Sequence, residues 1–166
     1  MPRKYSPDLQ AAQCRRLLEH CNPTWDAFHR LWIAFNALYN AVAGPTERER
    51  VRSVVQTFIT PDKASELLPR LVSAENPLPN PPPGDTRWSD SDPRFRRDSM
   101  IEAAAVNDAG RPSPERVAAL LALVYQVRCS LVHGNKNPDR FRDNELVSWG
   151  VSILEKVVPT LQDAMS

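Results

Sequence analysis

A run of large apolar residues at spacings of three and four most constrains what this chain can fold into. Between residues 25 and 42 they recur as Trp25, Phe28, Trp32, Phe35, Tyr39 and Val42. An α-helix has 3.6 residues per turn, so this spacing places all six side chains on one face. The pattern predicts a helix that packs against neighbours along its whole length. Asn22 is expected to cap it, with Pro23 at the first helical position.

The other segments are also typical of helices. We expect helices over residues 6–20, 46–58, 61–72, 98–107 and 113–133, and from residue 139 or 143 to the C-terminus. The helix at 113 carries a stripe that includes Val117, Leu120 and Val124, and Gly134 is expected to end it. The chain contains no convincing apolar alternation of period two and no phosphate-binding glycine motif. It therefore predicts a single all-α domain over residues 1–166, an antiparallel bundle of four main helices with short accessory helices.

The prolines interrupt this pattern at one place. The chain has 16 prolines, and five of them fall within residues 76–84. Neither a helix nor a central strand tolerates such a cluster, which predicts a Pro-rich loop over about 74–97. Loops of this length are uncommon in compact domains. A tolerated surface insertion is the favoured interpretation, and a PxxP ligand for an SH3-like partner (Pro79 to Pro82) is the alternative.

Composition excludes several classes of protein. Lys and Arg number 21 against 20 Asp and Glu, a net charge of +1. This balance argues against a strongly cationic nucleic-acid coat but leaves room for a local basic patch. Three cysteines without a CxxC pair favour neither a disulfide framework nor a structural zinc site. Because no apolar signal segment or membrane-length stretch is present, a cytoplasmic protein is expected, with no metal or cofactor.

The histidines narrow the choice of catalytic residue. His20 is expected at a helix end and His29 on the surface or flank of its helix, and Cys14, His20 and Cys21 match no standard metal spacing. His133 differs, because it follows Arg128 at the end of a buried helix. The stretch from Arg128 to Arg142 carries four Lys or Arg residues and one acid, Asp139. Such a basic segment beside an imidazole suits a phosphate.

A purely structural alternative stays open for this pair. Arg128 could satisfy a buried carboxylate, and His133 could simply cap the helix end. At about 100° per residue, the two positions also point roughly 140° apart on an ideal helix. They converge only if the helix end unwinds or if a second copy of the chain completes the site.

The same residues resemble the HEPN superfamily. Arg128-x4-His133 at the end of a penultimate bundle helix looks like the Rx4–6H signature of that superfamily, and the sequence around it resembles the Apea-like branch. Two stretches carry the likeness, Tyr125-x2-Arg128-x2-Leu131-x-His133-Gly134-Asn135-Lys136 and Leu31-Trp-Ile-Ala-Phe-Asn-Ala-Leu-Tyr39. The resemblance covers about residues 25–158, except the Pro-rich loop.

The resemblance implies an all-α homodimer in which the motifs of both copies meet. Many members are metal-independent endoribonucleases of toxin–antitoxin or antiviral defence systems. Carried over, His133 becomes the general acid/base and Arg128 the cation that stabilises the phosphate. RNA supplies the 2′-OH nucleophile, so an imidazole and a cation suffice. The expected RNA-binding or motif-supporting residues are Asn36, Asn135, Lys136 and Arg140, although Asn36 could equally make a helix-to-helix hydrogen bond.

Two departures from the family bear on function. Members often carry Asn, Asp or His directly after the arginine, where this chain has Cys129, and one subgroup carries Tyr where this chain has Asn135. The expected partners are RNA, a second copy and an antitoxin or partner protein. The main alternative to a ribonuclease is a non-catalytic HEPN-like module for dimerisation and binding. A phosphotransfer bundle, with His133 phosphorylated, is a remote third possibility.

Overall fold

The computed structural model describes residues 22–133 and 136–166, and this part of the chain is all helical. The predicted all-α fold is therefore confirmed. The expected helix over 6–20 lies outside the described residues, as do Cys14, His20, Cys21 and Asn135. The helices are α2 (Pro23–Tyr39), α3 (Glu47–Phe58), α4 (Pro61–Leu71), α5 (Arg94–Asn107), α6 (Ser113–Val132) and α7 (Phe141–Met165).

Side-chain caps mark where α2, α3 and α4 begin. The Asn22 side chain accepts hydrogen bonds from the backbone N–H of Thr24 at 3.1 Å and of Trp25 at 3.3 Å, as its position before Pro23 predicts. Helix α5, which has no side-chain cap, starts at Arg94 rather than at residue 98. There the Asp92 carboxylate accepts a hydrogen bond from the Arg94 N–H at 2.9 Å, so the first turn forms earlier.

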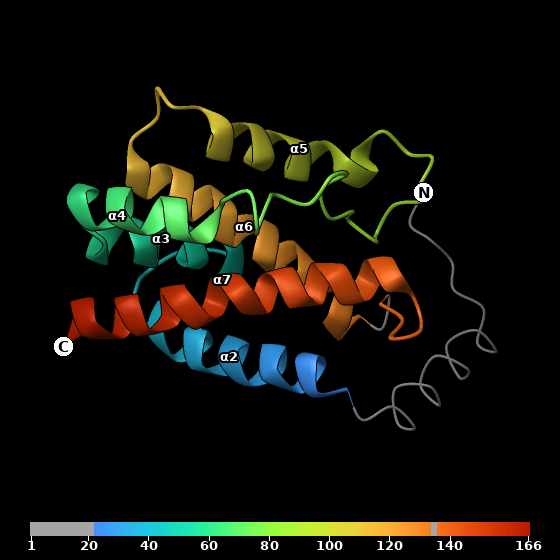
Figure 1. The fold of residues 1–166 in the computed structure, drawn as a ribbon, viewed down its shortest axis with the longest axis horizontal. Coiled ribbons are helices and arrows are strands. Elements are labelled where there is room, and N and C mark those ends of the chain that lie inside the picture. Colours follow the sequence, from blue (N-terminus) through green and yellow to red (C-terminus); the bar gives the residue numbers. More distant parts are fainter. Residues whose placement is uncertain (1–21, 134–135) are drawn as a thin grey trace.

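Helix α6 lies at the centre of the arrangement and contacts α3, α4, α5 and α7 (Figure 1). Helix α2 packs along α7 on the side away from α5. These two helices run in the same direction, because Asn22 bonds Asn144 near both N-termini while Phe28 lies against Gly150 further along. The bundle is thus not antiparallel throughout. Helices α2 and α7 are distant in sequence, so no short connection forces them to run in opposite directions.

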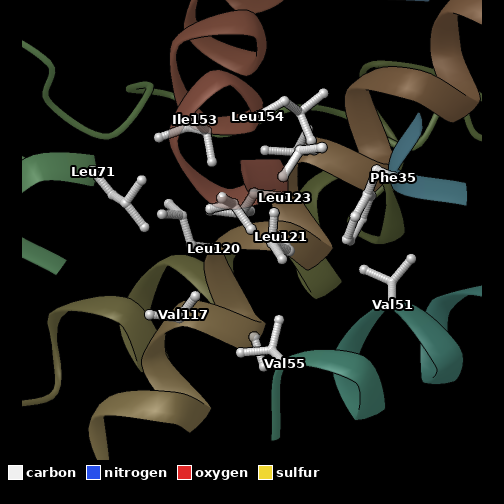
Figure 2. Close-up of a cluster of buried hydrophobic side chains, with 14 of the residues drawn as sticks. Phe35, Val51, Val55, Leu71, Val117, Leu120, Leu121, Leu123, Ile153 and Leu154 are labelled. Carbon is white, nitrogen blue, oxygen red and sulfur yellow. The ribbon is translucent and has the colours of Figure 1, made fainter. Parts of the chain in front are cut away.

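The core forms around α6. Every residue from Val117 to Val124 is buried, so the helix has no solvent face over this stretch. A helix that is apolar all round is expected inside a protein rather than on its surface. Figure 2 shows Leu120, Leu121 and Leu123 of α6 meeting side chains from the surrounding helices. Within residues 22–133 and 136–166, no helix has the length and apolar character needed to cross a membrane.

The Pro-rich loop joins α4 to α5 and crosses the molecule from one end to the other (Figure 1). Its contacts hold it against the helices. The Asn76 side chain donates to the Leu71 carbonyl at 2.6 Å and accepts from Ser152 of α7 at 3.1 Å. Gly84 is buried, and a Cβ there would lie 2.1 Å from a ring atom of Phe95. The loop can pass this close to α5 only because residue 84 has no side chain.

Candidate functional site

His133 ends α6 on the surface of the molecule. Its backbone N–H still bonds the Cys129 carbonyl at 3.1 Å, while its side chain is exposed. Residues 134 and 135 lie outside the described part, so the predicted role of Gly134 stays a prediction. The exposed imidazole fits both a reactive group and a simple helix cap.

Arg128 lies on the same helix but faces a carboxylate. Its Nη1 contacts Oε2 of Glu47, in the first turn of α3, at 3.1 Å. The other carboxylate oxygen of Glu47 accepts a hydrogen bond from the Tyr39 hydroxyl at 2.5 Å. Three helices therefore converge on one chain of polar groups, Tyr39–Glu47–Arg128. This is the arrangement that the structural alternative for Arg128 predicts.

Aromatic rings surround this chain of polar groups. The guanidinium carbon of Arg128 lies 6.0 Å from the ring centre of Trp32, at the outer limit of a cation–π contact. The Trp32 ring centre is 6.0 Å from that of Tyr39 and 6.2 Å from that of Tyr125. The Arg128 Nε is buried and has no hydrogen-bond partner among the described residues. About a quarter of the side chain (24%) remains exposed.

The pKa values of two tyrosines near this chain of polar groups are raised. Burial raises the pKa of Tyr39, and the hydrogen bond to the Glu47 carboxylate and its negative charge raise it further. Burial likewise raises the pKa of Tyr125, with a smaller contribution from its hydrogen bond to Cys129. Tyr39 thus remains a hydrogen-bond donor to Glu47 throughout the physiological range.

Lys136, expected to bind RNA at the surface, is instead buried in an ion pair. Its Nζ contacts Oδ1 of Asp143 at 2.8 Å, and the side chain is only 8% exposed. The second Asp143 oxygen accepts the Asn137 N–H at 2.9 Å. Lys136 therefore helps to close the turn between α6 and α7. Asp143 directly follows the basic stretch from Arg128 to Arg142, so the net charge of that stretch does not include it.

The two remaining described candidates lie at separate places. Asn36 is partly exposed on α2, and its side-chain oxygen accepts a bond at 2.5 Å from Asn40, one turn later in the chain. This bond lies near the end of its own helix and does not cross to another one. Arg140 is exposed at the N-cap of α7. Among residues 22–133 and 136–166, no hydrogen bond or ion pair joins Arg128 to His133, Asn36 or Arg140.

A small pocket adjoins the end of α6. It has a volume of about 320 Å³, and residues of α2 and α6 line most of it, among them Trp25, Asp26, His29, Leu131 and Val132. This volume is at the lower end of the range for small-ligand sites. His29 is exposed here, as its position off the aromatic stripe predicts. Val132, the residue before His133, is also exposed.

Sequence reasoning missed Glu47 and Tyr39. In the sequence, Tyr39 is simply one member of the apolar stripe. Glu47 is explained there as an acid that interacts favourably with the N-terminus of its helix. Glu47 and Arg128 are 81 positions apart, so spacing alone does not indicate their contact. No group of three or more His, Cys, Asp or Glu that could hold a metal occurs in the part of the chain that the structure describes.

No protein-family model matches this sequence, and no curated protein or solved structure matches it at a significant level.

Proposed function

We propose that this chain is a HEPN-type, metal-independent endoribonuclease that acts in the cytoplasm, in a toxin–antitoxin or antiviral defence setting. The observation that carries the proposal is that the last two turns of the buried helix α6 carry both a partly exposed guanidinium, Arg128, and, at the helix end, an exposed imidazole, His133. An all-helical fold is also what the resemblance implies.

The chemistry needs one base, one acid and one cation. The base takes the proton from a ribose 2′-OH, and the oxygen attacks the adjacent phosphorus. The bond from phosphorus to the 5′-oxygen breaks, and the acid donates a proton to that leaving oxygen. The products are a 2′,3′-cyclic phosphate and a 5′-hydroxyl. Arg128 stabilises the negative charge that develops on the phosphate oxygens.

A second copy of the chain supplies what one copy lacks. Each chain offers His133 once, whereas the reaction needs a base and an acid on opposite sides of the phosphate. In the proposed homodimer two helix tips meet, so both groups are present and the angle between Arg128 and His133 no longer matters. The exposed Val132 beside His133 is an apolar group that such an interface would cover.

Contacts to RNA outside the reacting linkage are assigned to Arg140. Arg140 is exposed and its side chain has no partner within the described part of the chain, whereas Lys136 is bound to Asp143. Phosphate contacts of this kind add affinity without sequence preference.

The test is cleavage of structured RNA in EDTA by the purified protein. We expect fragments with 2′,3′-cyclic phosphate ends, and no such fragments from the His133→Ala variant. Arg111→Ala is the matched control, because Arg111 is an exposed cation just before the opposite end of α6, where it pairs with Asp108. RNA left intact across many substrates, or equal cleavage by His133→Ala, would overturn the proposal.

A non-catalytic dimerisation and binding module is the second candidate. The ion pair between Arg128 and Glu47 favours it, because a guanidinium bound to a carboxylate has one fewer donor for phosphate. The presence of Cys129 in place of the usual polar residue points the same way. This candidate expects partner binding to survive His133→Ala, and loss of binding in that variant would contradict it.

A further inference from the structure

Glu47 joins the proposed phosphate-binding arginine to the core of the protein. We propose that Glu47 is a positioning residue, which fixes the Arg128 guanidinium in the orientation that grips the phosphodiester. This inference rests on the proposed ribonuclease function and concerns the same site. It assigns a role to a residue that neither the Rx4–6H spacing nor the local charge count includes.

The carboxylate of Glu47 is well suited to act as a fixed anchor. It stands at the first position of α3, where the helix N-terminus favours negative charge. The Tyr39 hydroxyl that bonds it belongs to a fully buried side chain, whose ring contacts that of Phe35 at a centre-to-centre distance of 5.1 Å. One oxygen of the carboxylate is thus held by a buried tyrosine, and the backbone of Glu47 is fixed at the start of α3. A group held this way does not swing aside easily.

The contact with Arg128 leaves part of the guanidinium for a ligand. Glu47 takes only Nη1, through a single hydrogen bond of 3.1 Å rather than a bidentate pair. The Nε is enclosed, with no partner among the described residues, and the Trp32 ring lies 6.0 Å from the guanidinium carbon. The phosphate contact therefore falls to Nη2. Because the guanidinium is planar, fixing Nη1 also fixes the direction in which Nη2 points.

The arrangement has an electrostatic consequence that a purely structural role lacks. Glu47 offsets part of the charge of Arg128, so it weakens the general attraction of the site for RNA. At the same time it holds the guanidinium in the orientation that the phosphate needs. Neutralising the Glu47 carboxylate should therefore change RNA binding and the rate of turnover in different directions. When the guanidinium loses this orientation, kcat falls, because a misplaced group stabilises the transition state less. Loss of a negative charge does not raise KM, because ground-state attraction to the RNA backbone increases.

The experiment compares Glu47→Gln with Glu49→Gln. Glu49 lies in the same first turn and its removal changes the net charge equally, but its carboxylate contacts Thr46 at 2.6 Å rather than Arg128. We expect Glu47→Gln to lower kcat by about 10- to 100-fold with KM unchanged or lower. Glu49→Gln should stay within about twofold of the wild type. Equal kcat in the two variants, or a kcat loss accompanied by a higher KM, would overturn the proposal.

A spectroscopic readout separates this proposal from the proposed function. The Nε–H signal of Arg128 in a ¹H–¹⁵N spectrum, assigned with Arg128→Lys, reports the position of the guanidinium without any cleavage. It should shift in Glu47→Gln and, by a smaller amount, in Tyr39→Phe, and stay in place in Glu49→Gln. If the signal does not shift in Glu47→Gln, the positioning role is contradicted even if the protein cuts RNA. A wild-type protein that cuts no RNA overturns the ribonuclease proposal, and with it the catalytic part of this one.

Discussion

At the scale of single residues, the long-range partners of the cations decide their roles. Arg128 and Lys136 belong to a segment whose own sequence is rich in basic residues. In the folded chain Arg128 meets Glu47 from α3, and Lys136 meets Asp143 from the next helix. The first pair stays about a quarter exposed, whereas the second is almost completely buried. Only the first is therefore open to a ligand.

The buried pair makes a testable contribution to stability. Lys136→Met leaves the Asp143 carboxylate buried without its cation, so we expect the free energy of unfolding to fall by about 3–5 kcal/mol. Urea unfolding at pH 7 measures this change. Lys63→Met is the matched control, since Lys63 forms an exposed pair with Glu66 at 3.4 Å and should cost at most about 1 kcal/mol. Equal losses in the two variants would show that burial of the pair does not matter.

Tyr39 and Tyr125 predict a loss of stability in alkali. The pKa values of Tyr39 and Tyr125 are raised in the folded protein, so both side chains stay protonated after the unfolded chain has begun to ionise. The unfolded state then binds fewer protons, and the free energy of unfolding falls as pH rises above about 10. The slope starts near zero at pH 8 and approaches about 1.4 kcal/mol per pH unit for each tyrosine near pH 11, where the unfolded side chain is almost fully ionised.

Urea unfolding at several pH values between 8 and 11 checks this slope. Tyr39→Phe should remove the share of Tyr39, because phenylalanine does not ionise. A slope that is identical in Tyr39→Phe and the wild type would contradict the assignment to this residue.

At the scale of elements, the sequence predicts which segments are helical better than it predicts their neighbours. The aromatic stripe and the Asn22-Pro23 cap locate α2, because both are local features. The parallel packing of α2 on α7 is not local. It depends on the close approach of Phe28 to Gly150, which are 122 positions apart, and no periodicity indicates that contact. For the same reason the sequence pointed to Arg128 but not to Glu47.

The close approach of Phe28 to Gly150 predicts that alanine at position 150 destabilises the protein, although alanine usually stabilises a helix. Alanine favours a helix over glycine by about 1 kcal/mol. However, a Cβ at Gly150 would lie 2.5 Å from a ring atom of Phe28, which is fully buried and stacked on Trp32. We expect Gly150→Ala to lower the free energy of unfolding by about 1–3 kcal/mol. Ser148→Ala, at an exposed position of the same helix, should be neutral or stabilising. A higher free energy of unfolding in Gly150→Ala would instead show that α2 can move aside to make room for the added methyl group.

At the scale of the whole molecule, the helices share one core around α6. Because α3, α4, α5 and α7 all contact α6, and α2 packs on α7, we expect the described part of the chain to unfold as one unit. Far-UV circular dichroism and tryptophan fluorescence should then give the same urea midpoint. Trp88 reports the Pro-rich loop, where the Arg94 guanidinium stacks 3.5 Å from its ring centre. Trp88→Phe should leave the two midpoints coincident, and a separate transition in either signal would argue against a single unit.

The lack of a solvent face on α6 also bears on how this protein can vary. A random change in the middle of that helix meets packed side chains on every side, so most such changes cost stability whatever they do to the site. Side chains of α6 reach water only near its two ends, in the turn before Val117 and from Tyr125 onward, where Arg128 and His133 lie. Deep mutational scanning should therefore find a helix whose centre tolerates almost nothing. The variants that alter what the protein recognises should cluster in its last two turns, where selection can act on chemistry apart from folding.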